Sequence, residues 1–168
     1  MTRFPLRRLR LRSGEVQRDA VEIELEPFEL GGQRYLPVPQ TVEAALTITQ
    51  ATTGLLFELG FAVRLHGPCM RCLEDAALDV RIDAREYHAA AADDEELRSE
   101  YVVEDQLELT AWARDAIALA LPDQILHDPN CAGLCPSCGK DLNVEPHSHD
   151  EISNDPRWSA LESLRDRL

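Results

Sequence analysis

The cysteines are the residues of this chain whose types and spacing could do chemistry. Cys69 and Cys72 form one C-x2-C pair, and Cys135 and Cys138 form a second pair, which Gly139 follows. A C-x2-C turn directs both thiolates to one side, and two facing turns give tetrahedral four-thiolate coordination with Zn–S distances of about 2.3 Å. We therefore predict a zinc site on Cys69, Cys72, Cys135 and Cys138. Four protein ligands leave no position for water, so the predicted role is structural.

The spacing of the two pairs leaves alternatives open. There are 62 residues between Cys72 and Cys135, whereas a compact zinc ribbon has about 15–20, so the site is expected to join distant parts of the fold. Cys131 is an alternative ligand, or a spare thiol that forms a disulfide when the metal leaves. His147 and His149 could also be ligands, although a short polar loop with two histidines is more often only a loop. Four cysteines also suit an iron–sulfur cluster.

Alternating apolar and polar residues predict the strands that position these turns. Half-buried strands are expected at residues 21–26, 42–49, 55–65 and 78–85. The link at 51–54 is short enough for a hairpin. A further strand at 34–38 would be confined to a sheet edge, because Pro37 and Pro39 cannot donate hydrogen bonds to a neighbour. The pattern predicts an antiparallel, meandering sheet that could curl toward a barrel.

One long helix and one short C-terminal helix are also expected. Asp105 is the predicted N-cap of the long helix, with Glu108 three residues on as in a capping box, and Pro122 ends it. Its apolar face comprises Leu109, Trp112, Ala113, Ala116, Ile117, Ala120 and Leu121. Asp155 and Pro156 predict the start of the short helix. The predicted fold class is α+β: a sheet, these two helices and a loop-rich four-cysteine metal knuckle.

The length of the chain suits a single domain over residues 1–168. Within it, residues 1–20 are expected to form a basic N-terminal arm or edge strand. Residues 88–104 are expected to form an acidic insertion, to which we assign no chemistry. Residues 123–155 contain few apolar side chains and are the predicted loop-rich metal-binding segment.

Charge is distributed unevenly and limits the partners. The net charge is −14, yet residues 1–18 contain six arginines and one glutamate. The acidic remainder repels a phosphate backbone, so any contact with RNA is expected to be local. The arginines that could make it are Arg3, Arg7, Arg8, Arg10 and Arg12. No apolar run approaches the roughly 20 residues that a membrane helix needs, and no secretory signal is evident, so a cytoplasmic location is expected.

Four contiguous segments follow one another along the chain: CMRCLE at 69–74, ALP at 120–122, CAGLCPSCGKDLN at 131–143 and DPRWSALESL at 155–164. In their sequence and order they resemble the YceD family, the large ribosomal RNA subunit accumulation proteins of bacteria and plastids. By position, the family's paired cysteines correspond to Cys69, Cys72, Cys135 and Cys138. Cys131 matches the cysteine that opens the family's second cysteine motif, at residues 131–143 here. Pro156, Arg157 and Leu161 match the C-terminal signature.

The resemblance implies a non-enzymatic accessory factor in ribosome biogenesis that supports accumulation of large-subunit rRNA. Its expected partner is the pre-ribosomal large subunit or a ribosomal protein. An alternative is a redox-responsive zinc–thiol protein, because Cys131 lies beside the predicted zinc ligands. An enzyme is the third hypothesis, with His66 as the candidate residue, but it would need an open metal position or an acid–base pair in a cleft. The oligomeric state is not predicted.

Overall fold

The computed structural model describes residues 1–89 and 97–149. It divides the chain into two compact units, Met1–Cys131 and Ala132–Leu168, and each is described by itself. The predicted helix at 155–168, with Pro156, Arg157 and Leu161, lies outside the described residues.

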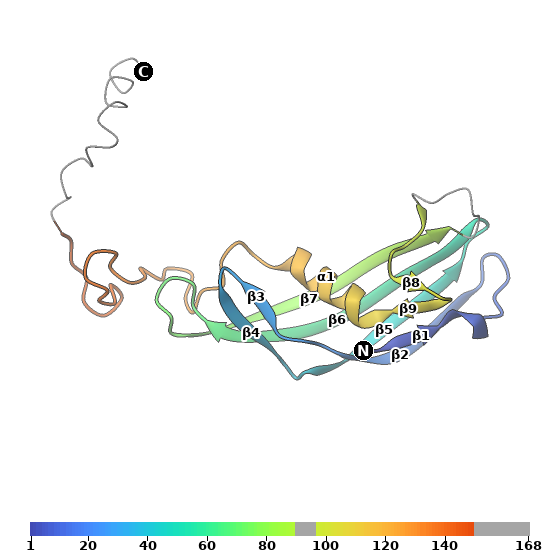
Figure 1. Cartoon of the computed structure of the whole chain (residues 1–168), viewed down its shortest axis with the longest axis horizontal. Coiled ribbons are helices and arrows are strands. Elements are labelled where there is room, and N and C mark those ends of the chain that lie inside the picture. The colour runs from blue at the N-terminus through green and yellow to red at the C-terminus, as the bar shows by residue number, and fades with distance from the viewer. Residues whose placement is uncertain (90–96, 150–168) are drawn as a thin grey trace, which may run out of the picture. The chain divides into compact units, whose positions relative to one another are not determined.

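The first unit is built on a large antiparallel sheet (Figure 1). Its strands are β2 (Val16–Glu24), β3 (Phe28–Leu30), β4 (Gln33–Val38), β5 (Thr41–Gln50), β6 (Gly54–Pro68) and β7 (Asp75–Ala89). The four strands expected from alternation are all present and each is longer than expected. The hairpin between β5 and β6 is also present, closed by the Ala51 amide, which donates to the Gly54 carbonyl at 2.9 Å.

β6 is the central strand of this sheet. One of its edges pairs with β7 along the whole of Gly54–Pro68, and the other pairs with β5 near its start and with β4 near its end. β2 continues the sheet beyond β5, and β3 continues it beyond β4. Pro37 pairs only with Leu65 of β6, since the pairing of β3 with β4 stops at Tyr35. The proline-containing half of β4 therefore lies at an edge, as predicted.

A small second sheet and the helix complete the first unit. The sheet has the order β1 (Arg3–Pro5), β9 (Gln106–Glu108) and β8 (Val102–Val103), and a short 3-10 turn, η1 (Leu6–Arg8), follows β1. Helix α1 (Leu109–Ala120) buries Leu109, Trp112, Ala113 and Ile117. The Trp112 ring lies edge-on to Phe57 of β6, with centroids 6.4 Å apart. α1 therefore packs on the apolar face of the large sheet.

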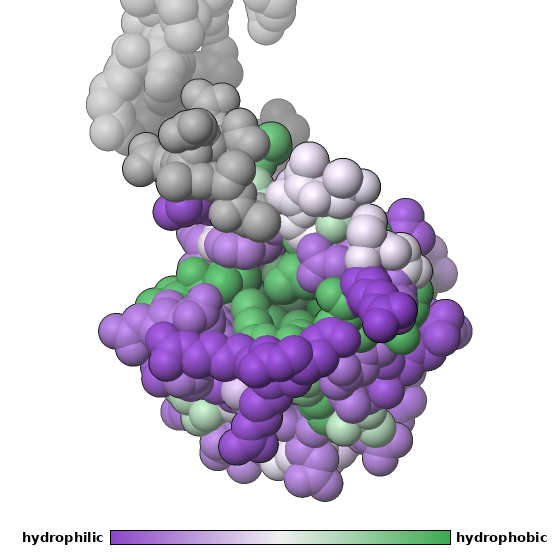
Figure 2. Space-filling model, turned by 90° about the vertical axis from the view of Figure 1, so that its right-hand side faces the viewer, coloured by the Kyte–Doolittle hydropathy of each residue, from purple (hydrophilic) through white to green (hydrophobic). Residues whose placement is uncertain are grey.

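The core lies between the large sheet and the elements that cover it. Alternate residues of the three central strands are buried, among them Leu46 and Ile48 of β5, Phe57 and Leu59 of β6, and Ile82 of β7. Figure 2 shows the first unit in space-filling form, with apolar residues gathered in a central hollow and hydrophilic residues around it. This arrangement is what period-two alternation requires, because one face of each strand meets the core and the other meets water.

The α+β prediction is wrong, because the described fold is mainly β with a single helix of 12 residues. Asp105 does not cap this helix: it has a positive φ of 60°, and the helix begins four residues later. The intervening Gln106–Glu108 forms β9, whose residues pair with Arg3–Pro5. A partner about 100 residues away in sequence thus overrides the local capping pattern. β1, β8 and β9 are only two or three residues long, too short for alternation to reveal them.

The second unit is loop-rich over its described part, residues 132–149. A single antiparallel bridge joins Leu134 to Asp141. The Gly133 carbonyl accepts from the Leu142 amide at 2.9 Å, and the Asn143 side chain accepts from the Ala132 amide at 2.7 Å. These bonds close residues 132–143 into a compact turn.

Candidate metal centres

The first candidate centre forms at the turn between β6 and β7. The Cys69 carbonyl accepts from the Leu73 amide at 3.0 Å, and the Cys69 amide donates to the Glu74 carbonyl at 2.7 Å. Leu73 adopts a left-handed conformation with φ of 68°. This compact turn directs the side chains of Cys69 and Cys72 to the same side.

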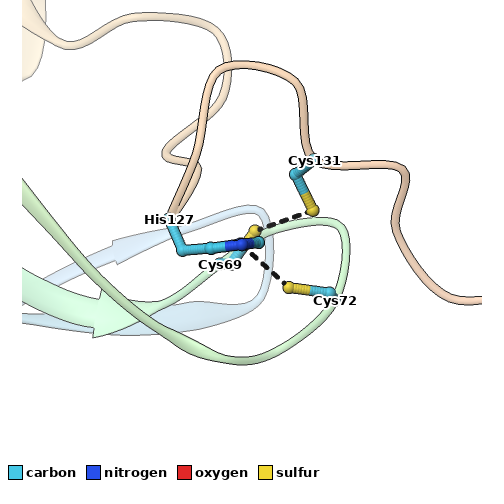
Figure 3. Close-up of side chains that lie close together, drawn as sticks. All are labelled: Cys69, Cys72, His127 and Cys131. Atoms are coloured by element: carbon cyan, nitrogen blue, oxygen red, sulfur yellow. Dashed lines mark hydrogen bonds between the residues drawn. The ribbon is translucent and has the colours of Figure 1, made fainter. Parts of the chain in front are cut away.

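The loop after α1 brings two further donors to this turn. The Met70 amide donates to the Ile125 carbonyl at 2.9 Å, and the Ile125 side chain is 2% exposed. Ile125 thus anchors the loop, and His127 and Cys131 follow it. Figure 3 shows the four side chains of Cys69, Cys72, His127 and Cys131 converging from the turn and the loop. Their ligand atoms all lie within 4.8 Å of one another.

The distances within this first group suit a tetrahedral ion. The Sγ atoms of Cys69 and Cys131 are 3.8 Å apart, and Cys72 Sγ lies 3.1 Å from His127 Nδ1. A zinc ion about 2.3 Å from two sulfurs at the tetrahedral angle holds them about 3.8 Å apart. All three cysteines are buried, whereas His127 is exposed. The group could hold a metal ion.

The electrostatics of the first group favour a thiolate at Cys69. Burial raises the pKa of Cys69, but a hydrogen bond from the His127 ring and backbone amides of the turn outweigh it and lower the pKa to about 5. Burial raises the pKa of Cys72 to about 11, and the neighbouring Cys69 thiolate adds to that rise. The pair therefore ionises in steps, and a cation placed between them would favour both thiolates.

The second candidate centre lies within the second unit. Cys135, Cys138, His147 and His149 have ligand atoms that all lie within 4.8 Å of one another. Cys138 Sγ is 3.1 Å from His147 Nε2, while the other ring nitrogen of His147 lies 2.7 Å from the Glu145 carbonyl. That carbonyl contact fixes the orientation of the ring, as is common for histidines that bind metals. This group could also hold a metal ion.

Backbone amides also lower the pKa of a cysteine in the second centre. Burial raises the pKa of Cys135, but the amides of Cys138 and Ser137, with the side chains of Cys138 and His147, lower it to about 6. The Glu145 carbonyl and the Cys135 thiolate raise the pKa of His147. A thiolate is thus available near neutral pH in each of the two groups, which is what metal binding requires.

The two C-x2-C turns have the same backbone structure. The Cys135 carbonyl accepts from the Gly139 amide at 2.8 Å, and the Cys135 amide donates to the Lys140 carbonyl at 2.8 Å. Cys69 makes the same two bonds with the residues four and five positions later. The residue four positions on is left-handed in both, with φ of 68° at Leu73 and 73° at Gly139. Each unit therefore contains one complete turn of the same type.

The structure brings the sequence-predicted ligands together in pairs. Cys69 and Cys72 lie in the first group with Cys131, and Cys135 and Cys138 lie in the second group. The predicted four-cysteine site would therefore take two ligands from each unit: Cys69 and Cys72 from the first, and Cys135 and Cys138 from the second. This site stays a prediction. His66, the candidate residue for an enzyme, is exposed on β6 and belongs to neither group.

His127 is the candidate ligand that the sequence reasoning missed. Its signal is the spacing His127-x3-Cys131, which with a C-x2-C pair makes the C-x2-C…H-x3-C arrangement typical of zinc sites. The sequence around His147 and His149 is that of an ordinary polar loop. Only the folded chain shows that both histidines approach the thiols of Cys135 and Cys138.

The N-terminal arginines lie on β1, η1 and the following loop, which carry none of the candidate metal ligands. Arg3 forms an ion pair with Glu108 at 2.8 Å, and Arg7 forms one with Asp105 at 2.8 Å. The Arg10 guanidinium donates to the carbonyls of Arg7 and Leu9. Arg8 and Arg12 are exposed. Part of the basic charge of residues 1–20 is therefore already balanced by acidic neighbours.

The fold and the two groups define a mainly β protein with clustered cysteine and histidine side chains that could hold metal. The model of the family described as "Large ribosomal RNA subunit accumulation protein YceD" matches residues 58–165, and this chain belongs to that family. The match includes all five cysteines and the three clustered histidines. No helix among the described residues is long and apolar enough to span a membrane.

Curated relatives occur in mycobacteria. Uncharacterized proteins of Mycobacterium tuberculosis and Mycobacterium bovis are 35% identical to this chain over 122 residues, which is 69% of this chain and 58% of theirs. An uncharacterized protein of Mycobacterium leprae is 33% identical over 102 residues, which is 57% of this chain and 46% of that protein. The chain thus spans about half the length of the curated relatives it matches. No solved structure matches it.

Proposed function

We propose that this chain is a non-enzymatic accessory factor in ribosome biogenesis that supports accumulation of large-subunit rRNA. The observation that carries the proposal is membership of a family described by that role. The partner is the pre-ribosomal large subunit or a ribosomal protein on it. In a bacterium the protein would then work in the cytoplasm, where ribosomes assemble.

Co-sedimentation tests this role. The tagged protein is expressed in cells, and the lysate is separated on sucrose gradients at low and moderate salt. We expect the protein in the fractions that contain precursors of the large subunit, and we expect its deletion to lower the ratio of large-subunit to small-subunit rRNA. A protein found only in the free fraction at both salt concentrations would overturn the proposal.

The charge distribution supports two kinds of contact with such a particle. The acidic body complements basic ribosomal proteins, and the arginines of residues 1–20 complement RNA phosphates. Arg8, Arg10 and Arg12 are exposed and form no ion pair with an acidic side chain in the described part of the chain. They are therefore better placed for RNA than Arg3 and Arg7, which would first have to leave Glu108 and Asp105.

A matched pair of triple variants separates the two kinds of contact. Replacing Arg8, Arg10 and Arg12 by alanine removes three charges from the arm. Replacing Arg64, Arg81 and Arg85, all paired with acidic residues on β6 and β7, removes the same charge elsewhere. If the arm binds RNA, only the first variant loses ultraviolet crosslinking to rRNA. The slope of the logarithm of its binding constant against the logarithm of the salt concentration should also become less negative, by roughly 0.7 for each phosphate that the arm no longer binds. Equal effects in both variants would assign RNA binding to overall charge.

We also propose that the cysteine-containing groups hold zinc in a structural role. Thiolate and imidazole donors in fours suit tetrahedral Zn2+, and a complete donor set leaves no open position for catalysis. The sequence predicts one ion on Cys69, Cys72, Cys135 and Cys138, with Cys131 as the alternative ligand. Serine variants of each cysteine, with zinc counted by mass, test that prediction.

A redox-responsive zinc–thiol protein is the second candidate function. The observation that favours it is the contact of Cys69 Sγ with Cys131 Sγ at 3.8 Å, because two such thiols can form a disulfide once a metal leaves. In that step hydrogen peroxide oxidises two thiols, one S–S bond forms, and two waters are released. Peroxide should then release zinc reversibly, and thiol reductant should restore binding. Unchanged release in Cys131→Ser would remove the support for this function.

A further inference from the structure

Each of the two groups of donors is complete within its own unit, whereas the single four-cysteine site predicted from the sequence would take two ligands from each unit. The first unit supplies Cys69, Cys72, His127 and Cys131, and the second supplies Cys135, Cys138, His147 and His149. We propose that the chain binds two zinc ions, one in each unit, through a Cys3His site and a Cys2His2 site. This inference rests on the proposal of structural zinc above and adds the ligands and the number of ions.

Use of the cysteines favours two ions over one. A single four-cysteine site leaves Cys131 without a role, although it is 2% exposed and its Sγ lies 3.8 Å from Cys69 Sγ. Two sites use all five cysteines of the chain, three in the first unit and two in the second. The first set reaches four donors with His127, which contacts Cys72 Sγ. The second reaches four with His147, which contacts Cys138 Sγ, and with His149, whose ligand atom lies within 4.8 Å of the other three.

The backbone of the two turns gives an independent argument. Both C-x2-C turns repeat the same hydrogen bonds and the same left-handed residue, at Leu73 and Gly139. A turn of this type places both of its cysteine side chains on one side, which suits two ligands of one tetrahedral ion. A repeated turn with its own histidine partner in each unit is the arrangement expected of two separate sites.

The surroundings of the first site suit the charge that it would carry. Three thiolates and a neutral imidazole around Zn2+ have a net charge of −1. Arg71 lies within this turn: its Nη1 donates to the Cys131 carbonyl at 3.0 Å and its Nε to the Gln124 side chain at 3.0 Å. The guanidinium thus ties the turn to the loop that carries His127 and Cys131, and its charge is opposite to that of the site.

The second site would be neutral, with two thiolates and two imidazoles. His147 is oriented by the Glu145 carbonyl, and its ring lies against that of His149, with centroids 5.0 Å apart. Glu145 is itself held by the Lys140 ammonium at 3.0 Å, and the Lys140 carbonyl is bonded to the Cys135 amide. The loop that carries the histidines is therefore tied back to the turn that carries the cysteines.

Native mass spectrometry of the full-length protein counts the ions directly. We expect two zinc ions in the wild type, one in His127→Ala and one in His147→Ala. The double variant is expected to bind none. His66→Ala removes an exposed histidine outside both groups and should retain two ions.

Rescue variants guard against loss of zinc through misfolding. His127→Cys and His147→Cys supply a different zinc ligand at the same position and should each restore the second ion, which a merely misfolded loop would not do. Substitution by Co2+ gives a second readout, because the thiolate-to-cobalt absorption grows with the number of thiolates bound. The His147→Ala protein should keep the three-thiolate signal, and the His127→Ala protein the two-thiolate signal.

Three results would overturn the inference. One zinc ion in the wild type, lost in Cys72→Ser and in Cys138→Ser but kept in His127→Ala, would establish the single four-cysteine site instead. Two ions retained in His127→Ala would exclude that histidine as a ligand. Protein purified without zinc that takes up none on reconstitution would refute structural zinc as a whole. None of these results depends on co-sedimentation with ribosomal particles, so the ribosomal role is tested separately.

Discussion

Leu73 and Gly139 occupy equivalent positions in the two C-x2-C turns, yet only Gly139 suits a left-handed backbone. For a residue with a Cβ atom this conformation is unfavourable by about 1–2 kcal/mol, whereas glycine adopts it without a steric penalty. The first turn tolerates the strain within a well-packed unit, where Ile125 and the ends of β6 and β7 hold it. The second turn lies in a segment with few buried side chains and has less packing to offset such strain.

Gly139→Ala should therefore weaken zinc binding in the second unit. A Cβ atom at Gly139 would meet nothing within 4 Å, so the effect comes from the positive φ alone. We expect a loss of about 1 kcal/mol, which is roughly a fivefold lower affinity, measured by competition with a chromophoric chelator. Gly139→Asn should lose less, because asparagine tolerates this conformation, and Ser137→Ala in the same turn is the control. Equal losses for alanine and asparagine would show that the conformation does not matter.

His88, near the end of β7, should make stability depend on pH. Burial lowers its pKa, as does Arg98, while Asp105 partly opposes them, and its Nδ1 atom is buried without a hydrogen-bond partner among the described residues. The unfolded chain then binds a proton more readily than the folded chain, so stability should fall as pH falls through about 6.5 and below.

Comparison with His88→Gln isolates this contribution. Acid also protonates cysteines and so releases zinc, but that loss is common to both proteins. Urea unfolding between pH 7.5 and 5.5 should give a smaller loss of stability in the variant than in the wild type. Parallel curves for the two proteins would contradict the assignment to His88.

At the scale of elements, β6 connects the core to the first candidate metal centre. Its middle residues form the core with α1, and its end leads directly into Cys69. Tyr35 of β4 fixes this end: its side chain is fully buried and its hydroxyl donates to the Pro68 carbonyl at 2.8 Å. The Tyr35 ring lies over Gly67, where a side chain would occupy the same space.

Gly67→Ala should consequently be much more destabilising than Gly60→Ala on the same strand. A Cβ atom at Gly67 would overlap the Tyr35 ring and lie 2.8 Å from the Arg34 carbonyl, whereas at Gly60 the nearest atom would be 3.6 Å away. We expect a loss of about 1–3 kcal/mol for Gly67→Ala, as for overpacking in general, measured by chemical denaturation. Zinc affinity at the first site should fall with it, because β6 and Cys69 move together. Similar stabilities for the two variants would show that Tyr35 can shift with little loss of stability.

At the scale of the whole molecule, the apolar core and the candidate metal centres lie in different segments of the chain. The buried aliphatic and aromatic side chains lie mainly in β5, β6, β7 and α1. The segments that carry the metal candidates, by contrast, are turns and loops with few apolar residues. Under the zinc proposal, metal binding would be the main source of order in those segments, whereas the sheet is held by its own core.

Removal of metal should accordingly loosen two segments and leave the sheet intact. After chelation, hydrogen exchange read by mass spectrometry should lose protection at residues 69–74 and 124–147. Protection in β5, β6 and β7 should remain, and so should the far-ultraviolet circular dichroism of the strands. Addition of zinc should restore the original protection. Global unfolding on chelation would contradict the separation of core and metal centres.

The sequence alone was sufficient to predict the elements that depend only on residues close to one another in the chain. The strands β2, β5, β6 and β7, the β5–β6 hairpin and the buried face of α1 follow from periodicity and turn length, because each depends on neighbours within a few residues. The C-x2-C turns belong to the same class, since two cysteines three residues apart share one turn whatever surrounds them. The resemblance to the YceD family likewise rests on contiguous motifs, among them residues 69–74 and 131–143.

Tertiary structure alone decided which distant groups meet. Gln106–Glu108 is a strand because Arg3–Pro5 pairs with it, although its own sequence suggested the start of a helix. His127 reaches Cys72 because Ile125 is buried against the β6–β7 turn, a contact between residues more than 50 positions apart. Periodicity and spacing record the conformation of a segment but not its partner across the fold. The sequence could therefore place two cysteines in each turn and name His147 and His149 as possible ligands, but only the fold showed which donors lie together and added His127.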